Sequence, residues 1–242
     1  MLTNQSLVFE YWNIGHCQMN WNLRLNPKIL NVFSKFWNVE SEDLITSFDG
    51  ASFELTNISN TKSWYHVDHS YLDSKFRNLQ SWITAFDVEP GDATLSVLES
   101  SHKYHSEFTK YFNITNFSDF YVLNNLEFDY YKNKCMERKI CCPKGSLVLW
   151  DSRTVHYGSN SLDKKNLRCV SYLCYIPRKY CTKKNLKYKK IAFENLDTTT
   201  HDPSLCKLKL KTPLGCEDDE NLYITKIKKP IINELGRKLC GY

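Results

Sequence analysis

The chain has 242 residues, of which 42% are hydrophobic, 14% aromatic and 24% charged. This is the composition of a globular protein of about one domain, and it excludes a chain that is disordered throughout. The net charge of +5 at pH 7 is unevenly distributed, because residues 178–242 carry 15 Lys and Arg against 8 Asp and Glu. That basic third could face nucleic acid or another polyanion, although a solvated lysine-rich surface is the favoured explanation.

The sequence shows no signal for export or membrane insertion. No run of about 18 apolar residues occurs, so no membrane-spanning helix is predicted. Residues 1–7 do not combine a basic stretch with an apolar one, so we expect an intracellular protein, cytoplasmic or nuclear, with ten reduced cysteines. The glycosylation sequons, which we expect to stay unmodified, begin at Asn4, Asn57, Asn113 and Asn116.

The first clear element is a helix that begins at Asn26 and Pro27. Asparagine is a preferred N-cap residue, and proline is favoured at the first helical position. Hydrophobic residues then recur at near-helical spacing through Trp37, so this helix is expected to pack on a core. We assign it to a helical segment, residues 1–43, on the substrate side of the domain.

Short strand-like segments separated by turns follow this helix. The expected strands lie at 44–53 (two strands around an Asp-Gly turn), 64–68, 80–88, 94–98, 145–150 and 168–176, and a helix is expected at 100–112. Many short strands with a few helices predict a mainly β protein with helical cover, an α+β fold built on a sandwich or barrel. We expect one domain, 1–242, in which the basic extension 178–242 packs on the core.

The residues that carry chemistry begin with His66 and Asp68, which are two positions apart at the end of a strand-like segment. Residues i and i+2 of a strand point to the same face, so the imidazole and the carboxylate converge. They supply two ligands of a facial metal triad if a second histidine joins them. His69 is the alternative to His66, but it alternates faces with Asp68.

The second histidine is His156, which follows the strand at 145–150. Eight residues rich in turn formers come next, and Arg168 opens the following strand. If these two strands form an antiparallel hairpin centred near Leu162, His156 and Arg168 face each other across the ladder. A metal-binding histidine opposite an arginine is unusual in a protein core. A dicarboxylate would explain this pair if one end chelated the metal and the other accepted two hydrogen bonds from the guanidinium.

This order of residues resembles the Fe(II)/2-oxoglutarate-dependent dioxygenases, and most closely the phytanoyl-CoA dioxygenase-like family, in a eukaryotic and viral branch of it. The resemblance covers about residue 45 to the end. One departure is that Glu99 and Ser100 stand where the family usually has Pro-Gly, in a loop. Besides the triad and Arg168, the similar segments are residues 80–85, 98–103, 150–153, 172–178, 198–203 and 236–241.

The resemblance implies a double-stranded β-helix (jelly roll, cupin-like) with the metal at one mouth. It implies that His66, Asp68 and His156 bind iron and that Arg168 holds the distal carboxylate of 2-oxoglutarate. Fe(II), 2-oxoglutarate and O₂ are then the expected cofactor and cosubstrates, with release of succinate and CO₂. Related halogenases have a small residue at the position of Asp68, so Asp68 favours hydroxylation of the prime substrate, which is not identified.

Several other residues are weaker candidates. Those that the position near the ligands suggests for the pocket are Tyr71, Gln80, Trp82, Thr84 and Arg153. The remaining histidines, His16, His102, His105 and His201, are expected to be structural. Structural zinc is not favoured, because the cysteines show no C-x₂-C pairs.

Three functional alternatives stay open at this point. One is the same oxygenase chemistry on nucleic acid or another polyanion, which the basic residues 178–242 suggest and a steep salt dependence would support. Another is a catalytically silent jelly-roll binding protein. A hydrolase that uses the metal as a Lewis acid is the third, and it leaves Arg168 without a role.

Overall fold

The computed structural model describes residues 8–54, 63–162, 166–213 and 227–242. The sequons at Asn4 and Asn57, and Cys216, lie outside these residues. The strands are β1 (Val8–Phe9), β2 (Leu44–Thr46), β3 (Ala51–Glu54), β4 (His66–Val67), β5 (Leu79–Thr84), β6 (Thr94–Leu98), β7 (Tyr121–Val122), β8 (Glu137–Lys139), β9 (Leu147–Asp151), β10 (His156–Ser159), β11 (Arg168–Tyr172) and β12 (Tyr175–Pro177). The helices are α1 (Gln18–Arg24), α2 (Pro27–Trp37), α3 (His105–Tyr111), α4 (Asn125–Lys132), α5 (Lys183–Glu194) and α6 (Glu234–Leu239), with 3₁₀ turns η1 (Ile14–His16), η2 (Ser41–Asp43), η3 (Ser101–Tyr104) and η4 (Arg178–Tyr180).

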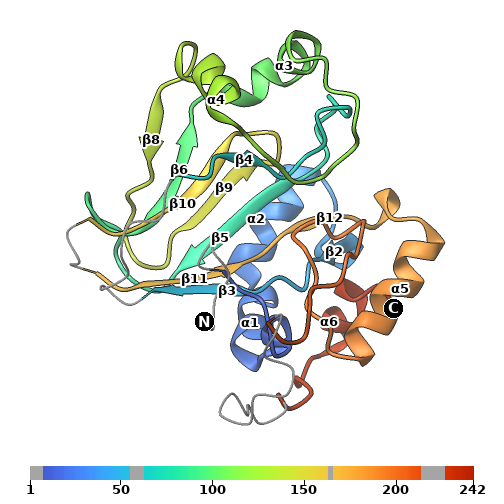
Figure 1. Cartoon of the computed structure of the whole chain (residues 1–242). Helices are drawn as coiled ribbons and strands as arrows, with labels where there is room; N and C mark the ends of the chain where they lie inside the picture. Colours follow the sequence, from blue (N-terminus) through green and yellow to red (C-terminus); the bar gives the residue numbers. More distant parts are fainter. Residues whose placement is uncertain (1–7, 55–62, 163–165, 214–226) are drawn as a thin grey trace. The chain divides into compact units, whose positions relative to one another are not determined.

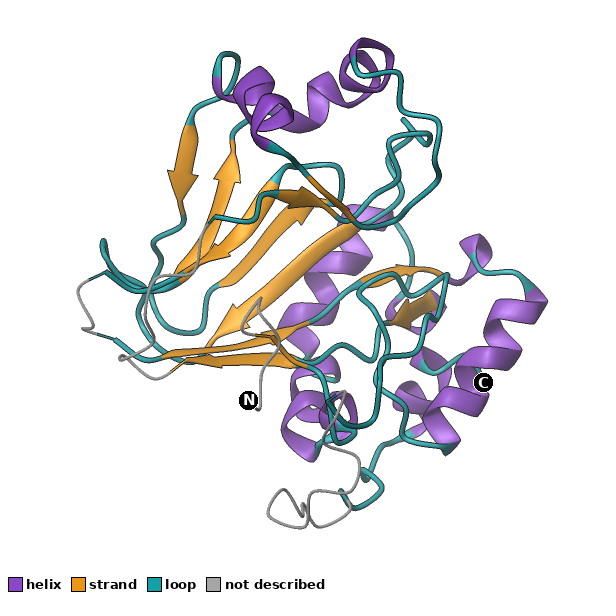
Figure 2. Ribbon diagram, viewed as in Figure 1, coloured by secondary structure: helices purple, strands orange, loops and turns teal. Residues whose placement is uncertain are grey.

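The predicted combination of β-sheets with helices is confirmed (Figure 2), and the strand pairs β1–β3, β4–β10, β6–β10, β2–β12, β4–β7 and β6–β8 are antiparallel. The chain divides into two compact units. The first consists of Met1–Phe53, Ser81–Ile83 and Val170–Tyr242, and the second of Glu54–Gln80 and Thr84–Cys169. Among the described residues, no helix combines the length and the apolar character that crossing a membrane requires.

The first unit contains the predicted helix, α2. The side chain of Asn26 accepts a hydrogen bond from the backbone N–H of Lys28 at 2.9 Å, as the N-cap assignment requires. Ile29, Leu30 and Phe33 on its inner face are buried. A separate cluster of buried side chains in this unit is formed by Trp21, Phe48, Ala192, Phe193, Cys206 and Cys240.

The second unit contains an antiparallel sheet with the strand order β7-β4-β10-β6-β8. Strand β10 lies between β4 and β6 (Figure 1), so both of its edges are paired. His156 at the start of β10 is opposite His66 of β4 and opposite Val97 of β6. A second five-stranded sheet has the order β1-β3-β11-β5-β9, and its strands β3, β5 and β11 have residues in both units. Strands β12 and β2 form a two-stranded sheet.

One face of the sheet β7-β4-β10-β6-β8 packs against an aromatic core. Val67 of β4 and Leu98 of β6 pack there against Phe108 of α3 and Tyr131 of α4. The Phe108 ring lies 4.2 Å from the ring of Tyr71 and 5.1 Å from that of Tyr131, measured between centroids. Because side chains alternate along a strand, the neighbouring residue His66 points to the opposite face from Val67.

The predicted hairpin of residues 156–159 and 168–172 is wrong. Strands β10 and β11 belong to different sheets, so His156 and Arg168 are not opposite each other. Residues after β10 are hydrogen-bonded to the turn that precedes β6. The N–H of Leu162 donates to the Gly91 carbonyl at 2.7 Å, and Asn166 donates to both carboxylate oxygens of Asp92. After these contacts the chain enters β11, which pairs with β3 and β5 and not with β10.

Replacement of Phe108 by alanine tests the importance of the aromatic core. Phe108 is fully buried, and removing its ring leaves a cavity, so we expect Phe108→Ala to lower the free energy of unfolding by about 3–5 kcal/mol. Tyr111 on the same helix is 71% exposed, and Tyr111→Ala is expected to cost less than about 1 kcal/mol. Urea unfolding of both variants measures the difference; equal losses would contradict the assignment of Phe108 to the core.

Candidate metal centre

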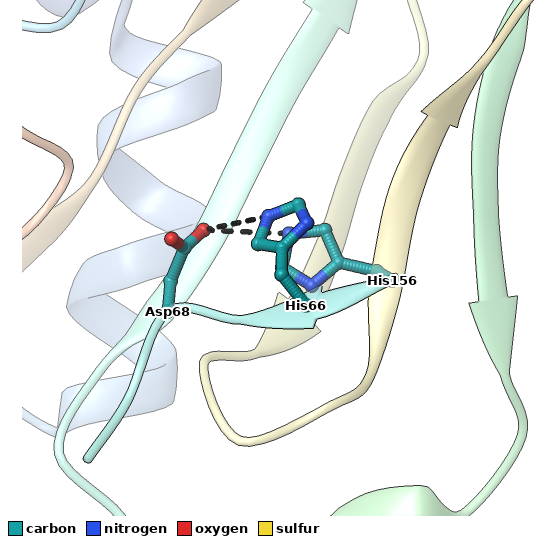
Figure 3. A group of neighbouring side chains, drawn as sticks. All are labelled: His66, Asp68 and His156. Carbon is teal, nitrogen blue, oxygen red and sulfur yellow. Dashed lines mark ion pairs between the residues drawn. The ribbon is translucent and has the colours of Figure 1, made fainter. Parts of the chain in front are cut away.

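His66, Asp68 and His156 come together in the second unit because of the pairing of β4 and β10. Directly opposed residues of an antiparallel pair carry their side chains on the same face of the sheet, and His66 and His156 are such a pair. Asp68 follows His66 by two residues and lies on the same side. Figure 3 shows the three side chains pointing toward one another.

The three side chains are close enough to share one metal ion. The Oδ2 atom of Asp68 lies 3.6 Å from Nε2 of His66 and 3.4 Å from Nε2 of His156 (Figure 3). The centroids of the two imidazole rings are 4.3 Å apart. One potential ligand atom from each of the three residues lies within 4.8 Å of the others, and within the described part of the chain this is the one such group of three or more side chains.

Hydrogen bonds orient both imidazoles so that Nε2 faces the carboxylate. Nδ1 of His66 is 3.2 Å from the carbonyl oxygen of Trp64, and Nδ1 of His156 is 2.8 Å from that of Thr154. A carbonyl oxygen only accepts, so Nδ1 carries the hydrogen in each ring and Nε2 keeps a lone pair for a metal. Burial, followed by the proximity of His156, lowers the pKa of His66, which favours the neutral form that binds a metal.

Gln80 of β5 orients the carboxylate. Its Nε2 atom donates a hydrogen bond to Oδ2 of Asp68 at 2.7 Å, and the side chain is buried. Partners of this kind fix the position of a ligating group and commonly change metal affinity when they are removed. Gln80, one of the residues predicted for the pocket, is therefore in direct contact with the metal group.

Aromatic side chains surround the two histidines. The Trp64 ring stacks on His66 with centroids 4.3 Å apart, and the Phe120 ring lies 5.1 Å from it. The Trp150 ring lies 5.4 Å from that of His156. None of these three rings was predicted for the site. Trp64 could have been found, because it is two residues before His66 on the same strand face, whereas Phe120 depends on the pairing of β7 with β4.

Arg168 is buried in the second unit, and its guanidinium contacts the chain just before β6. Its Nη1 atom donates to the carbonyl of Ala93 at 3.4 Å. Ala93 precedes β6, whose Val97 is opposite His156. At about 3.3 Å per residue, Ala93 and Val97 are about 13 Å apart along the strand. The arginine thus lies near the other end of β6 from the residue that pairs with His156.

The other residues predicted for the pocket make contacts of their own. Tyr71 is a core residue whose hydroxyl lies 3.2 Å from that of Tyr131. Arg153 forms an ion pair with Asp151 at 2.6 Å. The Thr84 hydroxyl donates to the carbonyl of Phe86 at 2.7 Å, in a turn. Trp82 is fully buried in the first unit.

His69, the alternative ligand, is not part of the metal group. Its Nδ1 atom lies 2.9 Å from the hydroxyl of Ser152, and its Nε2 lies 3.7 Å from the Asp73 carboxylate. His105 is buried and stacks on Tyr71 at 4.6 Å. Burial lowers the pKa of His105 to about 4, so this ring is neutral at pH 7.

Two imidazoles and one carboxylate on one side of an ion are the ligand set of the two-histidine, one-carboxylate facial triad. This set leaves open positions for exchangeable ligands, and it is typical of non-haem Fe(II) oxygenases. The donor set fits a divalent first-row metal ion, and both histidines already have the orientation that ligation requires.

Comparisons with known proteins find similar chains, although no family model matches. The chain is 28% identical over 204 residues to "Ava biosynthesis cluster protein O" of Aspergillus versicolor, an alignment that covers 80% of this chain and 65% of that protein. The structure of GlcNAc Inducible Gene 2, GIG2 (DUF1479), from Candida albicans is similar over 98% of this chain and 66% of that one, with a TM-score of 0.58 and 13% identity. The non-heme alpha ketoglutarate dependent carbocyclase SnoK from nogalamycin biosynthesis is similar over 65% and 58% of the two chains, with a TM-score of 0.47 and 17% identity.

These comparisons show a shared fold with the Candida protein. The chain spans about two thirds of the length of both the Aspergillus and the Candida relatives.

Variants of the metal group test its role. We expect His156→Ala to lower the affinity for Fe(II) or Co(II) at least 100-fold, because it removes one of three protein ligands. Gln80→Leu removes only the hydrogen bond to Asp68 and is expected to weaken binding about tenfold. Metal titration measured by isothermal calorimetry checks both. His102→Ala, at a partly exposed histidine outside the group, is the control, and an equal loss there would contradict the assignment.

Proposed function

We propose that the chain is a non-haem Fe(II)- and 2-oxoglutarate-dependent oxygenase on a jelly-roll core, as the sequence resemblance implies. The observation that carries this proposal is the arrangement in which two histidines present Nε2 to one carboxylate oxygen of Asp68. The fold similarity to the Candida protein over nearly the whole chain supports an antiparallel β scaffold of this kind.

In this proposal His66, Asp68 and His156 hold the metal. Iron bound there together with 2-oxoglutarate would supply the activation of O₂ needed to hydroxylate a C–H bond of the substrate, with release of succinate and CO₂. The chain's own residues orient the ligands: the carbonyls of Trp64 and Thr154 hold the imidazoles, and Gln80 holds the carboxylate. Asp68 occupies the third ligand position with a carboxylate, which favours hydroxylation as the reaction.

Arg168 is proposed to bind the distal carboxylate of 2-oxoglutarate. Its side chain is buried, and a guanidinium in such a place binds a carboxylate through two parallel hydrogen bonds. Glu54 interacts electrostatically with Arg168. Burial raises the pKa of Glu54, and the positive charge of Arg168 opposes this rise. Arg168 contacts the residue before β6, and His156 is opposite Val97 of β6, so the guanidinium and the proposed metal ligand both flank this strand.

The visible absorption band that Fe(II) and 2-oxoglutarate give together under anaerobic conditions tests this function. We expect the band in the wild-type protein, and we expect Arg168→Ala to need at least tenfold more 2-oxoglutarate, because charge-assisted hydrogen bonds are lost. Arg138→Ala, at a surface arginine that is paired with Glu99, is the control and is expected to leave the band unchanged.

Two results would count against the proposal. Absence of the band in a wild-type protein that also retains no iron would exclude the oxygenase and favour a binding protein. A band that responds equally to Arg168→Ala and Arg138→Ala would remove Arg168 from the cosubstrate site.

A further inference from the structure

Three buried polar side chains near the metal group have hydrogen-bonding atoms without a partner. These atoms are Nδ2 and Oδ1 of Asn78, Oε1 of Gln80 and Nε1 of Trp150. The three side chains are only 1%, 4% and 8% exposed. Native proteins satisfy the large majority of such atoms, because leaving one unpaired is costly. A concentration of unpaired atoms at one place therefore points to a group that binds there.

Gln80 of β5 and Trp150 of β9 lie on one face of these neighbouring strands, together with Asn78, the residue before β5. The N–H of Ser152 donates to the carbonyl of Asn78, and the N–H of Thr84 donates to that of Ser146. This antiparallel register puts Gln80 opposite Trp150, with their side chains on the same face. Asn78 precedes Gln80 by two residues and shares that face.

This face is directed at the metal group. The Nε2 atom of Gln80 donates to Asp68, and the Trp150 ring lies 5.4 Å from His156. The free Oε1 of Gln80 is thus on the same amide group that already touches a proposed metal ligand. A molecule that binds these atoms lies beside the metal.

The chemistry of the unpaired atoms limits what can bind. Oδ1 of Asn78 and Oε1 of Gln80 are acceptors and need an N–H or O–H donor. At neutral pH 2-oxoglutarate carries two carboxylates and a ketone and offers no donor, so it cannot satisfy them. Nδ2 of Asn78 and Nε1 of Trp150 are donors and need an acceptor. The bound group must therefore offer both a hydrogen-bond donor and a hydrogen-bond acceptor.

A planar group fits Asn78 best. A carboxamide presents its N–H donor and its C=O acceptor side by side in one plane, and a second planar edge with the complementary pattern forms two parallel hydrogen bonds with it. Asparagine binds the edge of adenine in this way. Carboxamides, lactams and nucleobases share such an edge.

The side chains around His66 indicate that the bound molecule also has an apolar part. Val122 of β7 is directly opposite His66 and is 48% exposed, and Phe120, 5.1 Å from the His66 ring, is 52% exposed. The Trp64 ring covers another side of His66. Exposed apolar side chains around a polar centre are typical of a small-molecule site.

We propose that Asn78, Gln80 and Trp150 form the substrate-recognition part of the site and bind the amide-type edge of an otherwise apolar small molecule. This inference rests on the proposed function only in that it calls the bound molecule the substrate. The binding itself depends on residues of β5 and β9.

Ligand-observed NMR titration of the full chain tests the proposal, with and without Zn(II) and 2-oxoglutarate. The probes are benzamide, which has an aromatic body and a free amide edge, and N,N-dimethylbenzamide, which lacks the donor. We expect benzamide to bind at least about tenfold more tightly than its dimethyl analogue, and Asn78→Leu to remove that difference. Trp150→Phe, which deletes only the donor side of the ring, is expected to weaken benzamide several-fold.

The controls separate recognition from structure. Asn133→Leu, at an exposed asparagine at the end of α4, is expected to leave both titrations unchanged. If Asn78 is unpaired in the free protein, Asn78→Leu leaves the melting temperature unchanged or raises it, because an apolar group replaces an unsatisfied one. A fall of more than about 4 °C would show that Asn78 is structural and would overturn the proposal.

The remaining outcomes are also decisive. Equal binding of the two benzamides, or benzamide binding that Asn78→Leu does not affect, would overturn the proposal while leaving the iron and 2-oxoglutarate band untouched. Benzamide selectivity in a protein that gives no such band would keep the binding site and reject the oxygenase. Adenosine, titrated in parallel, shows whether the preferred edge belongs to a nucleobase; tighter binding than benzamide that Asn78→Leu abolishes would support the same site.

Discussion

The pairing of β4 with β10 is the contact on which the metal group depends. His66 and His156 are far apart in the sequence, and only this register puts their imidazoles on one face of the sheet. A shift of one residue in either strand would turn one imidazole to the opposite face. Val67, the neighbour of His66, is fully buried in the aromatic core on that opposite face. The packing of Val67 against Phe108 and Tyr131 therefore stabilises the register that brings the ligands together.

The ligands are oriented before any metal binds. Backbone carbonyls two residues before each histidine hold Nδ1, so the strand that carries each ring also selects its tautomer. Gln80 restrains the carboxylate from a different sheet, so ligand positions depend on strands of both sheets within the second unit. Such preorganisation reduces the rearrangement that metal binding requires.

Local sequence patterns predicted the features that depend on residues close together in the sequence. The spacing of His66 and Asp68 was enough to place both on one side of a strand, and Asn26 with Pro27 was enough to place the start of α2. The strands at 94–98 and 145–150 also follow from local composition, although β9 begins at Leu147. The position of His156 after the strand at 145–150 suggested it as the second histidine, the resemblance to a dioxygenase family implied the same residue, and the structure brings it close to His66 and Asp68.

Long-range choices could not be predicted from the same patterns. Whether β10 pairs with β11 or with β4 and β6 depends on contacts between residues far apart in the sequence, such as those of Leu162 and Asn166 with the turn at 91–92. The segment 168–176 forms two strands, β11 and β12, because the pairing of β12 with β2 separates it from β11. The lysine-rich residues of α5 resemble a solvated surface in the sequence, yet Lys189 is buried over the Phe48 ring, 3.9 Å from Nζ to its centroid.

Anomalous X-ray diffraction at the iron absorption edge, from crystals equilibrated anaerobically with Fe(II), tests the metal centre most directly. We expect one strong anomalous peak about 2 Å from Nε2 of His66, Nε2 of His156 and a carboxylate oxygen of Asp68. A peak at the cysteines or at His69, or no peak in crystals that contain the intact β4–β10 pair, would contradict the assignment of these three residues as an iron site.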